Sequence, residues 1–180
     1  MCAMYVPVVL EEIKGRLKYI LFPLFFIAVG FNVITGFGLN EFLYRSYDLY
    51  SGRASVEEYK EKAFSTYPAI EFVNQNTPSG SRVLLAGEAK SFYLKRPYKV
   101  SSGYDYSILR TYLEKTNTFG EFRQALKSGG FDYIIFNLNE YRRLHQGYQR
   151  LPEDQFKKSL DFLKQFTPIF KQNGTYVFKL

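Results

Sequence analysis

The feature that most constrains the fold of this chain is an uncharged apolar run over residues 19–37, YILFPLFFIAVGFNVITGF. At about 1.5 Å of rise per residue, a helix over this run spans roughly 28 Å, which is close to the hydrocarbon thickness of a bilayer. Pro23 and the glycines in the run are compatible with this, because membrane helices tolerate both residue types. We therefore predict a transmembrane helix over residues 19–37. A buried core helix is one alternative; the other, a cleaved signal peptide, would be shorter and would carry a small-x-small cleavage site.

The charges that flank this run predict its orientation. Basic residues stand directly before it: Lys14, Arg16 and Lys18. Only Arg45 lies close behind it. Because cytoplasmic flanks of membrane helices are enriched in Lys and Arg, we expect residues 1–18 to be a cytoplasmic N-terminal segment. A linker over residues 38–52 then leads to an extracytoplasmic domain over residues 53–180, in a single-pass protein of the cell membrane.

Composition limits the partners and the chemistry. A chain of 180 residues allows one soluble domain of ordinary size beside the anchor. The formal charge is +7, but basic residues are spread along the chain and mixed with acidic ones, so we expect no nucleic-acid partner. Cys2 is the only cysteine and His145 the only histidine, so the sequence predicts no disulfide within the chain and no metal site. We expect no cofactor.

Alternating helical and strand patterns predict that the outer domain is α/β. Val83–Ala86 and residues 132–137 are short apolar runs with polar ends, as in buried strands. Two pairs have the spacing of a capping box, which marks a helix start: Ser55 with Glu58, and Thr118 with Glu121. Asn173-Gly174 between two strand-like runs indicates a type I′ turn. The expected fold is a small mixed sheet of about four or five strands with a C-terminal β-hairpin.

The sequence holds no complete motif of a known reaction. It has no Gly-rich phosphate loop, no Gly-x-Ser-x-Gly, no His-x-x-x-His and no Cys-x-x-Cys. Polar residues do follow the predicted strands: Glu88, Lys90, Asp105, Asn137 and Glu140. Ligands of open α/β sheets bind beyond the carboxyl ends of parallel strands, so these residues are candidates for one cleft. The alternative, which the polar strand ends of any such sheet favour, is that they cap helices and pair with basic residues.

A second candidate group mixes aromatic and basic side chains around the predicted edge strand. Its members are Tyr93, Arg96 and Tyr98. Such a group can stack on a sugar or contact a polyprenyl-phosphate head group. The alternative is an ordinary edge-strand face whose charges prevent aggregation, and the sequence favours this alternative.

Several segments together resemble a known family. They are AIEFVNQNTP at residues 69–78, RVLLAGE at 82–88, FYL at 92–94, RPY at 96–98 and LKSGGFDYIIFN at 126–137, followed by Glu140 and Arg143-Leu144. Preceded by a membrane helix, this order resembles the C-terminal extracytoplasmic domain of bacterial multi-spanning glycosyltransferases. Those enzymes are similar to the dolichyl-phosphate-mannose–protein mannosyltransferases, which use lipid-phosphate sugar donors. The catalytic acids of that family lie on an early extracytoplasmic loop that this sequence lacks, so the resemblance assigns no catalytic residue.

Three functional hypotheses follow. The first, which the resemblance implies, is a membrane-anchored accessory domain, related to the non-catalytic end of a lipid-linked-sugar glycosyltransferase and including the case of a truncated member. On this hypothesis the chain alone transfers no sugar, because the multi-spanning part would be needed. The second is a single-span interaction module that docks on a polytopic membrane protein. The third is a small independent enzyme that uses Glu88 and Asp105.

Overall fold

The computed structural model describes residues 17–101, 104–147 and 151–180. Residues 1–16, most of the predicted cytoplasmic segment, therefore lie outside the described part. The chain divides into two compact units between Tyr59 and Lys60.

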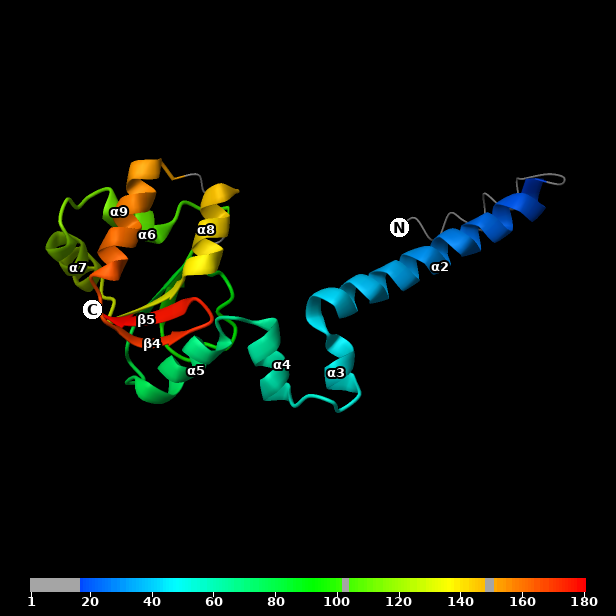
Figure 1. Cartoon of the computed structure of the whole chain (residues 1–180), viewed down its shortest axis with the longest axis horizontal. Helices are drawn as coiled ribbons and strands as arrows, with labels where there is room; N and C mark the ends of the chain where they lie inside the picture. Colours follow the sequence, from blue (N-terminus) through cyan, green and yellow to red (C-terminus); the bar gives the residue numbers. More distant parts are fainter. Residues whose placement is uncertain (1–16, 102–103, 148–150) are drawn as a thin grey trace. The chain divides into compact units, whose positions relative to one another are not determined.

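The first unit contains one long helix, α2, which runs over Leu17–Tyr44 (Figure 1). Its part from Tyr19 to Tyr44 is long and apolar enough to cross a membrane, and no side chain in its most apolar window is buried. These properties fit a membrane span, and they also fit a signal sequence near the N-terminus. The side chain of Asn32 is satisfied within the helix, because its amide nitrogen donates to the carbonyl oxygen of Ala28 at 2.8 Å.

The helix α2 continues beyond Phe37, where the apolar run ends, to Tyr44. It ends at Arg45, whose φ of 50° lies in the left-handed region and breaks the helical path. A short helix, α3, follows over Ser46–Tyr50. Much of the predicted linker over residues 38–52 is therefore helical.

The second unit is built on one sheet of five strands in the order β2-β1-β3-β5-β4. The strands are β1 Val83–Ala86, β2 Tyr98–Val100, β3 Tyr133–Asn137, β4 Pro168–Gln172 and β5 Thr175–Lys179. β1 is parallel to both β2 and β3, whereas β5 is antiparallel to β3 and β4. This confirms the predicted α/β fold with a mixed sheet and a C-terminal hairpin.

Helices cover the two faces of the sheet unequally. Alternate residues of a strand point to opposite faces, and both faces of β1 and β3 are buried. On one face, Ile70 and Val73 of α5, Tyr67–Asn76, pack against Leu85 and Ile135. The opposite face packs against the remaining helices: α6 Ile108–Leu113, α7 Phe119–Ser128, α8 Leu138–Gln146 and α9 Glu153–Lys164.

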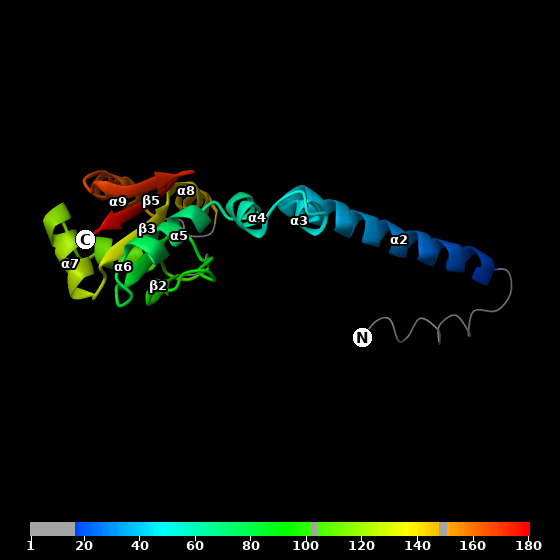
Figure 2. The same ribbon diagram turned by 90° about the horizontal axis from the view of Figure 1, so that it is seen from below.

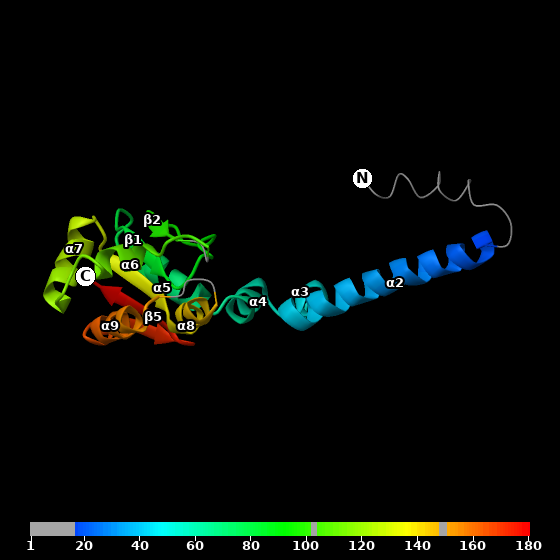
Figure 3. The same cartoon turned by 90° about the horizontal axis from the view of Figure 1, so that it is seen from above.

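The three views show this arrangement. In Figure 1, α5 lies below the sheet and α6 to α9 lie above it. Figure 2 looks from the side of α5, and Figure 3 shows α8 and α9 side by side over β5. The parallel strands β1 and β3 lie at the centre, so the residues that follow them occupy the middle of one edge of the sheet.

Local signals in the sequence account for several boundaries. Ser55 and Glu58 exchange side-chain-to-backbone hydrogen bonds of 2.8 and 3.2 Å, and this capping box begins α4, Val56–Ala63. Thr118 and Glu121 do the same at the start of α7. In the hairpin, Asn173 has φ of 51° and Gly174 has φ of 76°, as a type I′ turn requires. These three predictions are confirmed.

Candidate functional site

The carboxyl ends of β1 and β3 meet at a switch point of the sheet. β1 lies between β2 and β3, so the chain leaves β1 towards one side and returns on the other. In open α/β sheets, the crevice at such a point is the usual ligand position. Glu88 follows β1 there, and Asn137 is the last residue of β3. The structure thus brings together two of the residues that the sequence proposed for a cleft.

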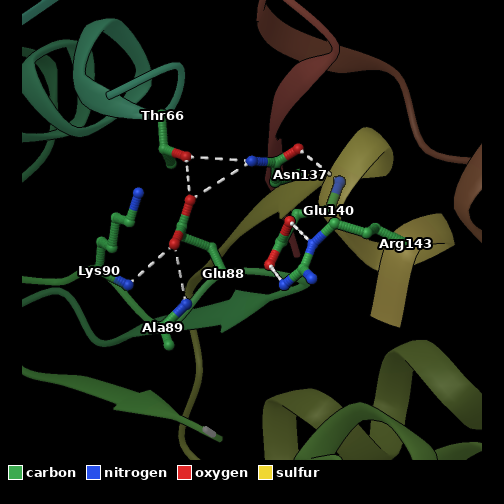
Figure 4. Close-up of polar contacts among 7 residues, drawn as sticks. All are labelled: Thr66, Glu88, Ala89, Lys90, Asn137, Glu140 and Arg143. Carbon is green, nitrogen blue, oxygen red and sulfur yellow. Dashed lines mark hydrogen bonds and ion pairs between the residues drawn. The ribbon is translucent and has the colours of Figure 1, made fainter. Parts of the chain in front are cut away.

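The carboxylate of Glu88 is held by four hydrogen bonds (Figure 4). Its Oε2 accepts from the hydroxyl of Thr66 at 2.5 Å and from Nδ2 of Asn137 at 3.3 Å. Its Oε1 accepts from the backbone N–H groups of Ala89 and Lys90, both at 2.9 Å. With a side chain this buried, a carboxylate is stable only when its oxygens are satisfied, and here both are.

Thr66, Glu88 and Asn137, which we call the Glu88 network, join three elements. Thr66 is the residue before α5, and its hydroxyl also accepts from Asn137 at 3.2 Å. Asn137 caps α8, because its Oδ1 accepts from the N–H of Glu140 at 3.1 Å. A carboxylate with both oxygens occupied has to break a bond before it can take a substrate proton. The network therefore has the arrangement of a structural lock, the second of the two interpretations of these strand-end residues.

Gly87 makes this close approach possible. Its φ of 68° is in the left-handed region, which glycine adopts at little cost. A Cβ at this position would lie 2.5 Å from the carbonyl oxygen of Asn137 and 2.7 Å from Cβ of Tyr141. The turn after β1 can therefore pack against the start of α8 only if this residue has no side chain.

Glu140 lies beside the network and forms a bidentate ion pair with Arg143 (Figure 4). The two hydrogen bonds measure 2.7 and 2.6 Å. Those bonds from Arg143, together with its charge and that of Lys90, hold the pKa of Glu140 below its usual value. Glu140 is thus a carboxylate at neutral pH, with its charge directed to a basic neighbour on its own helix.

The side chains of the other two proposed cleft residues lie outside this network. The ammonium group of Lys90 is exposed and lies 5.3 Å from the ring centroid of Phe64. Asp105 is exposed on the loop between β2 and α6, and the hydrogen bonds of Glu88 go to other residues. The structure therefore separates Glu88 from Asp105 in environment as well as in hydrogen bonding.

The second candidate group is divided between structural and surface roles. Arg96 donates to the backbone carbonyl oxygens of Asn74 at 2.5 Å and Thr77 at 2.7 Å, which satisfies the C-terminal end of α5. Tyr98 is on the edge strand β2 and is 43% exposed. Tyr93 is 37% exposed, and its ring meets that of Tyr67 edge to face at 5.3 Å.

Tyr93 also belongs to a group that sequence reasoning missed. Lys60 lies over the rings of both Tyr67 and Tyr93, at 5.5 and 5.2 Å. The ring centroids of Phe64 and Tyr93 are 5.9 Å apart. We call the five residues the aromatic–lysine cluster: Lys60, Phe64, Tyr67, Lys90 and Tyr93. The spacing of Lys60, Phe64 and Tyr67 near a helix start was the available signal, but their partners come from beyond β1.

These geometries leave two kinds of surface at the candidate site. The Glu88 network is closed by its own hydrogen bonds. In the aromatic–lysine cluster, Tyr67 is buried, but Phe64, Tyr93 and the two lysines are at least partly exposed and favour anionic or sugar-like ligands. Among the residues that the structure describes, no group of three His, Cys, Asp or Glu is placed to hold a metal ion. Comparisons of the chain with protein-family models, curated proteins and solved structures found no match.

Proposed function

We propose that this protein is a membrane-anchored, non-catalytic domain that lies outside the cytoplasm and assists a polytopic glycosyltransferase which uses lipid-phosphate sugars. Its role is to help bind the sugar-phosphate part of the donor or acceptor near the transferase. The observation that carries the proposal is the contrast at the switch point of the sheet. There, the carboxylates of Glu88 and Glu140 form hydrogen bonds and an ion pair within the domain. Part of the aromatic–lysine cluster, by contrast, is exposed to solvent.

The anchor is supported by α2 and by the charges around it. Its part from Tyr19 to Tyr44 is long and apolar enough to cross a membrane, and none of its most apolar window is buried. Basic residues precede it in the sequence, and the positive-inside rule then favours an N-terminus in the cytoplasm.

The non-catalytic role is supported by the state of the strand-end acids. Acid–base catalysis needs a carboxyl group within reach of substrate and free to exchange a proton. Glu88 has both oxygens bonded within the fold, and Glu140 is paired with Arg143. The resemblance to the C-terminal domain of membrane glycosyltransferases supports the choice of partner.

A second candidate function is an interaction module for a polytopic protein of another kind. Large aromatic side chains around the edge strand favour it, since exposed aromatics are enriched at protein interfaces. Phe92 is 81% exposed and Tyr104 is 84% exposed.

Orientation is tested by labelling with a membrane-impermeant maleimide in intact cells. The natural Cys2 should be protected until the cells are opened. In a Cys2→Ser background, Ser128→Cys, at an exposed position of α7, should be labelled at once. The reverse pattern would place the domain in the cytoplasm and end the proposal.

Function is tested by deleting the protein from its host and measuring sugar transfer from lipid-phosphate donors in isolated membranes. Transfer should fall, and the full chain should restore it. A Lys60→Met/Lys90→Met double variant should restore it poorly, whereas Lys127→Met/Lys157→Met, which removes two exposed lysine charges elsewhere on the domain, should restore it fully. Unchanged transfer on deletion, with co-purification of a different polytopic protein, would favour the interaction module instead.

A further inference from the structure

An apolar cavity of about 290 Å³ is lined by residues of α8, α9 and the strands β3, β4 and β5, and by none of the residues of the Glu88 network or the aromatic–lysine cluster. It is open to solvent between α8 and α9, and its floor is formed by Phe136 of β3 and Phe178 of β5. Leu160 and Leu163 of α9 form one wall. In Figure 3, these two helices lie side by side over β5.

The packing of α9 explains why this space is not filled. Near the start of α9, the ring of Phe156 stacks on the rings of Tyr141 and His145 of α8, with centroid distances of 5.6 and 3.9 Å. At the far end, Phe166 turns towards Phe119 of α7, at 4.7 Å. These ring contacts hold both ends of α9, and the cavity remains beside Leu160 and Leu163, with Leu138 of α8 also lining it. A hollow lined by leucine and phenylalanine excludes well-bonded water and favours an apolar occupant.

The rim of the cavity is basic. Arg142 and Lys164 both line it, one from α8 and one from α9. Arg142 is exposed and forms no hydrogen bond or ion pair within the part of the chain that the structure describes. Lys164 pairs with Asp161 at 3.0 Å, but both groups are largely exposed, so water and salt weaken this pair. The opening of this apolar cavity thus carries two cationic side chains, and one of them, Arg142, has no anionic partner in the described part of the chain.

We propose that this cavity binds a single-chain amphiphile with a phosphate monoester head. The hydrocarbon chain enters between α8 and α9 and covers Leu160, Leu163 and Phe178. The phosphate lies at the rim, where Arg142 offers a guanidinium fork that matches phosphate oxygens and Lys164 offers a point charge. This proposal does not depend on the proposed function, because it uses none of the residues of the aromatic–lysine cluster.

Size and charge select this ligand among the amphiphiles of a membrane. Pockets for drug-sized ligands hold about 300–1,000 Å³, so a cavity at the lower limit of that range fits a ligand with a single hydrocarbon chain. A phosphate monoester carries about −1.5 to −2 charges at neutral pH, whereas a carboxylate carries one. Two cations at one mouth therefore favour the phosphate head.

The test uses the full chain in phosphatidylcholine nanodiscs and a set of photoreactive probes. Each probe has the same decyl chain with a diazirine, and the heads are a phosphate monoester, a carboxylate and an alcohol. After illumination, labelled peptides are identified by mass spectrometry. We expect labels on the peptides that contain Leu138–Gln146 and Leu160, with the phosphate probe strongest and the alcohol weakest.

Two variants separate the chain from the head. Arg142→Ala/Lys164→Ala should lower labelling by the phosphate probe roughly tenfold, the effect of losing a charge-assisted hydrogen bond, and should leave the alcohol probe unchanged. Leu160→Trp, which fills the space, should lower labelling by all three probes. Arg123→Ala removes an exposed cation from α7 and should behave as the parent chain. Circular dichroism of each variant confirms that it is folded.

Two results would overturn the proposal. Equal labelling by the three heads would show that the rim does not recognise charge. Labels that stay on α2, or that persist in the Leu160→Trp variant, would show that the probe follows the bilayer and not the cavity.

Discussion

The hydroxyl of Thr66 donates to Oε2 of Glu88 at 2.5 Å, and this bond fastens the start of α5 to the turn after β1. In the sequence, Thr66 precedes β1 and Glu88 follows it. Their hydrogen bond therefore links α5, on one face of the sheet, to the carboxyl end of the central strand β1. Asn137 extends the link to α8 on the other face.

Loss of this hydroxyl should destabilise the domain. Thr66→Val leaves the buried Glu88 carboxylate with one partner fewer, which costs about 1–3 kcal/mol of unfolding free energy. Urea unfolding of the chain in mild detergent, followed by near-ultraviolet circular dichroism, measures it. Thr167→Val, at an exposed position before β4, is the control and should change little. If the two variants were equally stable, the network would not be a structural lock.

Gly87 should be intolerant of any side chain. Gly87→Ala combines a left-handed φ of 68° with a Cβ placed 2.5 Å from the carbonyl oxygen of Asn137. We expect a loss of more than about 2 kcal/mol, from strain and overpacking together. Gly120→Ala is the matched control, because nothing lies within 4 Å of its added Cβ on α7. A Gly87→Ala domain as stable as the Gly120→Ala domain would contradict the packing described for this turn.

Tyr141 should make the domain sensitive to alkali. Burial raises the pKa of its phenol from 10.0 to about 12, and its hydroxyl donates to Ser159 at 3.0 Å. The folded value lies above the unfolded one, so this contribution is complete below pH 10 and is lost as the pH rises towards about 12. The loss amounts to about 3 kcal/mol, since two pKa units separate the states.

Unfolding free energies measured between pH 8 and pH 12 test this. Tyr141→Phe should be less stable at neutral pH by about 1 kcal/mol, the usual worth of a hydrogen bond. Its stability should nevertheless fall less steeply above pH 10. Tyr104→Phe, at a position that is 84% exposed, should keep the steeper profile of the parent chain. Parallel profiles for the parent and Tyr141→Phe would argue against a buried neutral phenol.

Arg96 should contribute to the stability of the domain, whereas the side chain of Lys90 should contribute little. Arg96 satisfies two carbonyl groups at the end of α5, and a lysine cannot reproduce this planar fork. Arg96→Lys should therefore cost about 1–2 kcal/mol. The exposed ammonium group of Lys90 lies over Phe64, so Lys90→Met should change stability by less than about 0.5 kcal/mol. Unfolding curves of the two variants measure both losses of unfolding free energy. A larger loss for Lys90→Met than for Arg96→Lys would contradict the structural role given to Arg96.

Much of the fold was predictable because its signals are local. The capping boxes, Asn173-Gly174 and the apolar strands each depend on a few adjacent residues, and each appears in the structure. The continuation of α2 to Tyr44 was not predicted, because the continuous apolar pattern weakens after Phe37. Gly38, Asn40 and Glu41 interrupt that pattern, but none of them by itself stops a helix.

The candidate site was predictable only in part. The rule that residues after parallel strands meet at one edge of the sheet correctly predicted that Glu88 and Asn137 lie close together. It gave no sign of Thr66, which lies before the first strand, nor of the carbonyl groups that hold Arg96. Those contacts depend on where α5 packs against the sheet, and that placement follows from the whole core.

The position of β5 has a consequence for synthesis. Thr175–Lys179 is inserted between β3 and β4, and Val177 and Phe178 are buried in the two opposite cores. Until these residues have emerged from the ribosome, β3 lacks a neighbour on one side and α9 has no finished surface to rest on. The α/β domain of this protein must therefore remain open while most of it is being made, and its sheet is completed only when the final hairpin is available.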